Sequence, residues 1–307
     1  MIEIVATPES VAQAKALLAL GVDNLYLGED YFGLRLPHSF ERAELTEVVA
    51  LAHAAGKKVT VAVNAIFHND RIVHVLDYLQ FLASLKVDQI TVGDAGAINL
   101  LIENQVPLAY LYDASVTVTS ARQINFWAKH QAQGAVIAQE VPYEELKTLA
   151  PALQVPGEML VFGATAIHQS GRPLVDNYFD FVKAHQEKSD RKRGLFISAP
   201  RKPETHYSIY EDRNGTHVFA SNDIDLMPRL DKLVELGLNR WKLDGIFCPG
   251  DDYVTITGLF IQAKNAFENQ QWTSALAADL DAQLHALLPK NREVDTGFFD
   301  IDPSEVQ

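Results

Sequence analysis

Cysteine is nearly absent from this chain, and its scarcity excludes several kinds of site. Cys248 is the single cysteine among 307 residues, so no disulfide framework and no thiolate metal cage can form. The G-x-G-x-x-G spacing of dinucleotide-binding loops is also missing, as is H-E-x-x-H. His68 and His74 stand six residues apart, which does not place them on one helix face. We therefore predict no metal site.

Long apolar runs and an excess of positive charge are lacking too. No apolar run approaches about 18 residues, and the opening MIEIVATPES lacks the charged-then-apolar pattern of a signal peptide. We therefore expect a soluble, cytoplasmic protein. The net charge of −14 argues against binding bare nucleic acid alone, because phosphate contacts need clustered basic side chains. The one dense basic run, Lys188–Arg193, is expected to be a solvated loop.

Short apolar runs alternate with amphipathic segments along most of the chain. This alternation is typical of βαβ units and a parallel sheet. Eight runs of this kind predict an α/β fold, a (β/α)8 TIM-like barrel, over residues 1–290, followed by a polar tail, 291–307. The expected strands are Ile2–Ala6, Asn24–Leu27, Lys58–Val63, Gln89–Val92, Leu108–Tyr112, Gly134–Ala138, Glu158–Phe162 and Arg240–Leu243.

A long insertion, residues 163–239, separates the seventh strand from the eighth. Within it, HYSIYEDRNGTHVFAS alternates around Asn214-Gly215, which predicts a β-hairpin. Asp223 stands where the N-cap of a following helix is expected, and Gly237 could close that helix.

Polar residues follow most of the expected strands, and in an eight-fold barrel function lies at this end. Any single one of them is expected simply to meet water, so only the group as a whole indicates a lined pocket. Its members are Glu29, Asn64, Asp94, Asp113, Glu140, His168, Lys242 and Asp244.

The segment His168–Arg172 holds the sharpest local group. Histidine can move protons, an activated serine can be a nucleophile, and arginine can grip a carboxylate with two hydrogen bonds. A G-x-S-x-G elbow is absent around Ser170, however. A structural Ser-Gly-Arg turn, a substrate contact and a hydrolytic nucleophile therefore all stay open.

An anion site is the second candidate. Arg172, Arg201 and Lys242 lie at or beyond the last two strands, where barrels commonly hold anionic ligands such as a dicarboxylate or a phosphate. The alternative is that Lys242 forms a structural ion pair with Asp94 or Asp113. The predicted catalytic residues are His168, Ser170 and Asp244, and the predicted substrate-binding residues are Arg172, Arg201, Lys242, Asn64 and Asp113.

Two patches of the chain read EMLVFGATAIHQSGRP, from Glu158, and RGLFISAPR, from Arg193. Both resemble the signature segment of the collagenase-like peptidase U32 family. GVDNLYLGEDYFGLR, the Asn-Gly-Thr of the hairpin and the late Thr-Gly-Phe are similar to other family motifs. Members with an iron–sulfur cluster carry four cysteines in the two patches. The corresponding positions here hold Ala166, Pro173, Phe196 and Pro200. The resemblance therefore implies a member without a cluster of its own, since thiolates hold such clusters.

The chain also departs from the family pattern at three places. Phe162 stands where a histidine is usual, Ile246 stands where an arginine is usual, and Asp113-Ala114-Ser115 replaces Ser-Thr-Gln. With its length and missing cysteines, it is most similar to the shorter subunit of the family's two-protein systems for tRNA 5-hydroxyuridine biosynthesis. This implies an accessory or co-catalytic subunit for prephenate-dependent hydroxylation of the wobble uridine. The implied partner is a longer, cysteine-bearing paralogue that holds the iron–sulfur cluster, with tRNA bound through the complex.

Two other functions stay open. One is a U32-type peptidase, a hydrolase that acts alone, although no nucleophile–base or zinc motif supports it. The other is a non-catalytic barrel that binds a small acid or a partner protein.

Overall fold

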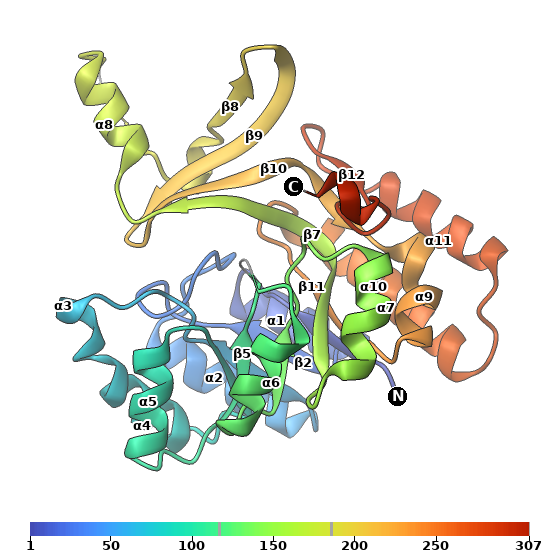
Figure 1. Ribbon diagram of the computed structural model, residues 1–307, viewed down its shortest axis with the longest axis horizontal. Helices are drawn as coiled ribbons and strands as arrows, with labels where there is room; N and C mark the ends of the chain where they lie inside the picture. The colour runs from blue at the N-terminus through green and yellow to red at the C-terminus, as the bar shows by residue number, and fades with distance from the viewer. Residues whose placement is uncertain (116–117, 185–186, 307) are drawn as a thin grey trace.

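Eight parallel strands close into a barrel in the computed structural model, which describes residues 1–115, 118–184 and 187–306 (Figure 1). β11 pairs with both β1 and β7 and so closes the ring. The predicted (β/α)8 fold is thereby confirmed. The barrel strands are β1 (Glu3–Ala6), β2 (Asn24–Leu27), β3 (Lys58–Ala62), β4 (Gln89–Val92), β5 (Ala109–Asp113), β6 (Gly134–Val136), β7 (Gly157–Ser170) and β11 (Arg240–Leu243).

Most of the helices surround the barrel, because one apolar face of each packs on the strands. α1, for example, begins where the Ser10 hydroxyl accepts a hydrogen bond from the Gln13 N–H and ends at Gly21 with φ of 101°. No helix in the described ranges has the length and apolar character needed to cross a membrane. The helices are α1 (Val11–Leu20), α2 (Arg42–Ala54), α3 (Asn69–Ile72), α4 (Val75–Ser84), α5 (Ala95–Glu103), α6 (Ala121–Lys129), α7 (Tyr143–Ala152), α8 (Leu174–Phe181), α9 (Leu230–Glu235), α10 (Gly250–Glu268) and α11 (Ser274–His285).

An arm rises above the carboxyl ends of the barrel strands (Figure 1). It consists of the outer half of β7, helix α8, and strands β8 (Phe196–Ala199), β9 (Lys202–Asp212) and β10 (Gly215–Asp225). β9 and β10 pair antiparallel across the Asn214 turn. The prediction that the seventh strand ends at Phe162 is wrong, because β7 continues to Ser170 by pairing antiparallel with β10.

The N-cap role predicted for Asp223 is also wrong. Asp223 lies inside β10, and its carboxylate accepts a 2.8 Å hydrogen bond from Nε of Arg292. Both side chains are buried, so this ion pair ties the C-terminal segment to the arm, where β12 (Glu293–Asp295) pairs with β10. The helix begins later, after a 3-10 turn at Met227–Arg229, and Gly237 follows its end with φ of 71°.

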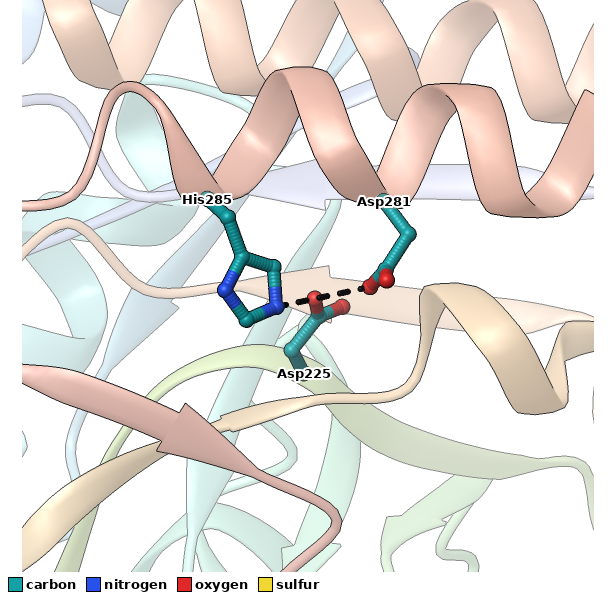
Figure 2. A group of neighbouring side chains, drawn as sticks. All are labelled: Asp225, Asp281 and His285. Carbon is teal, nitrogen blue, oxygen red and sulfur yellow. Dashed lines mark ion pairs between the residues drawn. The ribbon is translucent and has the colours of Figure 1, made fainter.

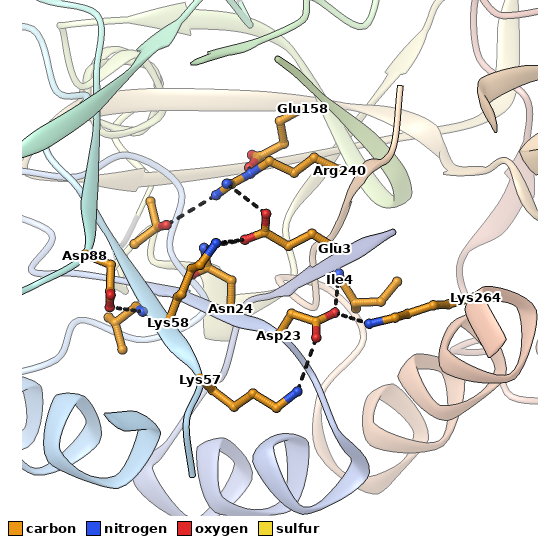
Figure 3. A network of polar contacts seen from close by, with 12 residues as sticks. Glu3, Ile4, Asp23, Asn24, Lys57, Lys58, Asp88, Glu158, Arg240 and Lys264 are labelled. Atoms are coloured by element: carbon orange, nitrogen blue, oxygen red, sulfur yellow. Dashed lines mark hydrogen bonds and ion pairs between the residues drawn. The ribbon is translucent and has the colours of Figure 1, made fainter. Parts of the chain in front are cut away.

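A network of charged side chains occupies the amino ends of the strands (Figure 3). Arg240 donates to the buried Glu158 carboxylate at 2.7 Å and lies 3.3 Å from Glu3. Asp23 accepts hydrogen bonds from Lys264 and from the Ile4 N–H. Although burial alone raises the pKa of Asp23, these contacts outweigh it and hold the pKa below its ordinary value. Charges at this end of a barrel act on stability rather than on function.

Candidate functional site

A small pocket lies between the carboxyl ends of the barrel strands and the arm. Its volume is ≈ 60 Å³, which is room for a few water molecules or one carboxylate group. Ala164, Ala166 and Phe219 line it from the arm. The remaining lining residues belong to the barrel and its loops: Tyr26, Leu34, Arg35, Asn64, Thr91, Asp113, Ser115, Val136, Gln139, Leu160, Lys242 and Asp244.

Side-chain hydrogen bonds hold the arm over the pocket. Nδ2 of Asn214, at the hairpin turn, donates to the Asp30 carbonyl at 2.9 Å, and Arg71 donates to Oδ1 of Asn214 at 2.8 Å. Nη1 of Arg191 donates to the Leu36 carbonyl at 2.9 Å. The basic run expected to be a solvated loop therefore supplies a side chain that anchors the arm to the barrel.

Two glycines allow the backbone to come close at this end of the barrel. Gly163 has φ of +124°, and a Cβ there would lie 2.4 Å from the Asp244 carbonyl oxygen. A Cβ at Gly33 would lie 2.7 Å from Cβ of Ala62. No side chain fits either position, so β7 lies close beside the residue that follows β11, and the loop after β2 packs against β3.

Lys242 is one of the two cationic side chains that line the pocket, the other being Arg35. Its Nζ lies 3.4 Å from the centre of the Tyr26 ring, a cation–π contact. Within the described part of the chain, no carboxylate lies within 4.0 Å of Nζ. The proposed ion pair with Asp94 or Asp113 is therefore wrong. Asp94 instead accepts from the Ala97 N–H and caps α5.

Asp244 lies one residue beyond β11. Its Oδ1 accepts a 3.0 Å hydrogen bond from the Ile246 N–H and a 3.4 Å hydrogen bond from the Thr7 hydroxyl. Burial raises the pKa of Asp244 above its ordinary value, and the positive charge of Lys242 only partly offsets this. A carboxyl with a raised pKa beside a cation is suited to exchange a proton with a bound acid.

Asn64 and Asp113 form the opposite wall. Nδ2 of Asn64 donates to Oδ2 of Asp113 at 2.7 Å, and Oδ1 of Asn64 accepts from the Leu34 N–H. Oδ1 of Asp113 accepts from the Ser115 N–H at 3.0 Å. The structure thus brings together four residues of the predicted site: Asn64, Asp113, Lys242 and Asp244.

Arg35 also lines this pocket, and reasoning from the sequence missed it. Its φ is 54°, and its Nη1 donates to Oε1 of Gln169 at 2.8 Å, so it connects the loop after β2 to the arm. The one available signal was its place at the end of GVDNLYLGEDYFGLR, a segment that resembles a family motif.

The other four predicted site residues lie outside the pocket. His168 is exposed on β7, and the Ser170 hydroxyl accepts a hydrogen bond from the Arg172 N–H at 3.2 Å, which is a turn contact. Arg172 and Arg201 are exposed on the arm. The catalytic role of His168 and Ser170 stays a prediction, and neither residue lines the pocket that Asp244 lines.

The four positions that carry cysteines in cluster-binding relatives do not fit an iron–sulfur cluster. Ala166, Pro173, Phe196 and Pro200 have no side-chain atom that ligates iron. Cys248 is buried in the loop after β11, and burial raises the pKa of its thiol to about 12, so the thiolate is disfavoured.

The fold and the pocket define a (β/α)8-barrel protein with a polar site at the carboxyl ends of its strands. The chain belongs to Peptidase family U32, whose family model matches residues 9–307.

The chain is similar to proteins named for tRNA hydroxylation and to a protein named as a peptidase. It is 32% identical over 300 residues to tRNA hydroxylation protein P2 of Bacillus subtilis, an alignment that covers 97% of both chains. It is 21% identical over 310 residues to tRNA hydroxylation protein P1 of the same organism, covering 98% of this chain and 71% of that one. Among solved structures, the U32 peptidase Mk0906 is similar in fold, with a TM-score of 0.52, 16% identity and coverage of 80% of this chain and 92% of that chain.

Proposed function

We propose that this chain is the shorter, accessory or co-catalytic subunit of a tRNA hydroxylation pair, acting in prephenate-dependent hydroxylation of the wobble uridine. The observation that carries this proposal is the full-length match to tRNA hydroxylation protein P2, at 32% identity. The match to the longer protein P1 supports the pairing, because it covers only 71% of that chain. The iron–sulfur cluster belongs to the longer, cysteine-bearing paralogue.

The pocket contributes a place for the carboxylate of a small acid. Lys242 and Arg35 supply positive charge, and Asp244 can exchange a proton. A space of ≈ 60 Å³ has room for the carboxylate group of such an acid. The remainder of such an acid would extend toward the rim. The exposed Arg172 and Arg201 are then available to contact tRNA phosphates from the arm.

Helix α8 offers a surface for the partner. Four apolar side chains, the last from the residue that follows the helix, are exposed at spacing i, i+4, i+7 and i+8, which places them on one side of it. They are Leu174 (42% exposed), Tyr178 (61%), Phe181 (84%) and Val182 (45%). Large exposed apolar groups in one place indicate a protein interface, and we assign this one to the longer paralogue.

Phe181→Ala is expected to weaken binding of the longer paralogue about tenfold, because aromatic anchors dominate the binding energy of such interfaces. Calorimetric titration of the two purified proteins measures the dissociation constant. Asp180→Ala is the matched control, since Asp180 is exposed on the opposite side of α8. Equal affinity for wild type and Phe181→Ala would exclude α8 as the interface.

Deletion of the gene tests the proposed function itself. We expect 5-hydroxyuridine to disappear from the tRNA of the deletion strain and to return when the wild-type gene is restored, as measured by mass spectrometry of tRNA nucleosides. Unchanged 5-hydroxyuridine in the deletion strain would contradict the proposal. It would favour a barrel that binds an acid or a partner for another purpose.

A further inference from the structure

Asp225, Asp281 and His285 meet where α11 lies beside the end of β10, and none of the three lines the pocket (Figure 2). Asp225 ends β10, whereas Asp281 and His285 are one helical turn apart on α11. One potential ligand atom from each residue lies within 4.8 Å of the other two. Nε2 of His285 lies 3.7 Å from Oδ1 of Asp281.

The buried carboxylate of Asp225 points into this cluster (Figure 2). The residue is only 3% exposed, and its Oδ1 accepts a 2.8 Å hydrogen bond from the Met227 N–H. Its Oδ2 is buried and has no hydrogen-bond partner among the residues that the structure describes. A buried carboxylate oxygen without a partner is costly, so a cation or a proton is required there.

We propose that Asp225, Asp281 and His285 bind a divalent first-row transition cation, with Zn²⁺ as the best match. One imidazole nitrogen and two carboxylate oxygens form a donor set that Zn²⁺ accepts, and water would complete the coordination. Spacing i, i+4 places Asp281 and His285 side by side on one face of α11. The hydrogen bond from the Met227 N–H would then fix the orientation of the Asp225 carboxylate toward the cation.

Binding requires the cluster to contract. Ligand atoms about 2 Å from a tetrahedral zinc ion lie about 3.3 Å from one another, which is less than the present maximum of 4.8 Å. His285 is exposed near the end of α11, so its ring can move toward the carboxylates. A cation bound here would join α11 to the strand that returns from the arm. The site is therefore structural in character.

Titration of the full-length chain with Zn²⁺ after treatment with a chelator tests this site. We expect one equivalent of Zn²⁺ to bind and the melting temperature to rise with added Zn²⁺. With Co²⁺ in place of Zn²⁺, we expect the visible absorption spectrum of a site with a low coordination number. His285→Ala and Asp225→Asn should each weaken Zn²⁺ binding about tenfold or more. Asp279→Asn is the matched control, because Asp279 is an exposed carboxylate on the same helix.

Two results would overturn the proposal. The first is Zn²⁺ affinity that is unchanged in His285→Ala, which would place any bound metal elsewhere. The second is the absence of Zn²⁺ binding to the wild type. A stabilising effect of Asp225→Asn would then show that the two carboxylates share a proton instead. His285→Ala keeps the test decisive if Asp225→Asn does not fold, because His285 is exposed.

Discussion

Lys242→Met is expected to lower the 5-hydroxyuridine content of tRNA about 30-fold or more while leaving the protein folded. The substitution removes one of the two positive charges that line the pocket and keeps an unbranched stem over the Tyr26 ring. A hydrogen bond to a charged group contributes about 1.5–3 kcal/mol, which corresponds to roughly 10- to 150-fold. Mass spectrometry of tRNA nucleosides from a deletion strain carrying the variant gene measures the effect.

Two further variants separate loss of the site from loss of the protein. Lys129→Met removes the same charge from an exposed position on α6 and should leave modification unchanged. Asp244→Asn keeps an oxygen that can accept from the Ile246 N–H but loses the exchangeable proton, so it should reduce modification without loss of partner binding. Wild-type levels of 5-hydroxyuridine with Lys242→Met, at an equal protein level, would exclude the pocket as a functional site.

The barrel could be predicted from the sequence because each of its strands is a short apolar run with its own local signal. Asn24–Leu27, Gln89–Val92 and Arg240–Leu243 have the predicted bounds in the structure. Parallel strands in a closed barrel bring their carboxyl ends together, and for this reason Asn64 and Lys242 could be placed in one site from their positions alone.

The arm could not be predicted in the same way, because its shape depends on partners distant in the sequence. β7 continues beyond Phe162 only because β10 pairs with it about 50 residues later. Asp223 favours a helix cap locally, but pairing with Arg292, 69 residues away, places it in a strand. The place of Arg172 just after β7 in the sequence predicts a position at the barrel mouth, yet the arm carries this residue away from it.

The cluster that includes two residues of α11 likewise could not be predicted from the sequence. Asp281 and His285 have helical spacing that is common on exposed helix faces. Only the fold brings the buried Asp225 to them from β10. The absence of metal-binding sequence motifs therefore bears only on sites whose ligands are close together in the sequence. It gives no information on sites assembled from separate elements.

Arg240→Ala is expected to lower the free energy of unfolding by about 3–5 kcal/mol, because it leaves a buried charge without its partner. Glu158 is fully buried, and one of its carboxylate oxygens, Oε1, already has no hydrogen-bond partner among the described residues. Arg240 donates to the other oxygen at 2.7 Å and also contacts Glu3 (Figure 3). Urea unfolding followed by circular dichroism measures the change.

Comparison with two other variants distinguishes the loss of the ion pair from a general packing defect. Replacing both partners, as Arg240→Met with Glu158→Leu, should restore much of the stability, since no uncompensated charge stays buried. Lys15→Met breaks the exposed pair with Glu47, whose side chains are 54% and 52% exposed, and should cost less than about 1 kcal/mol. If Arg240→Ala cost no more than Lys15→Met, the network at the amino ends of the strands would contribute little to stability. The apolar contacts between strands and helices would then hold that end of the barrel closed by themselves.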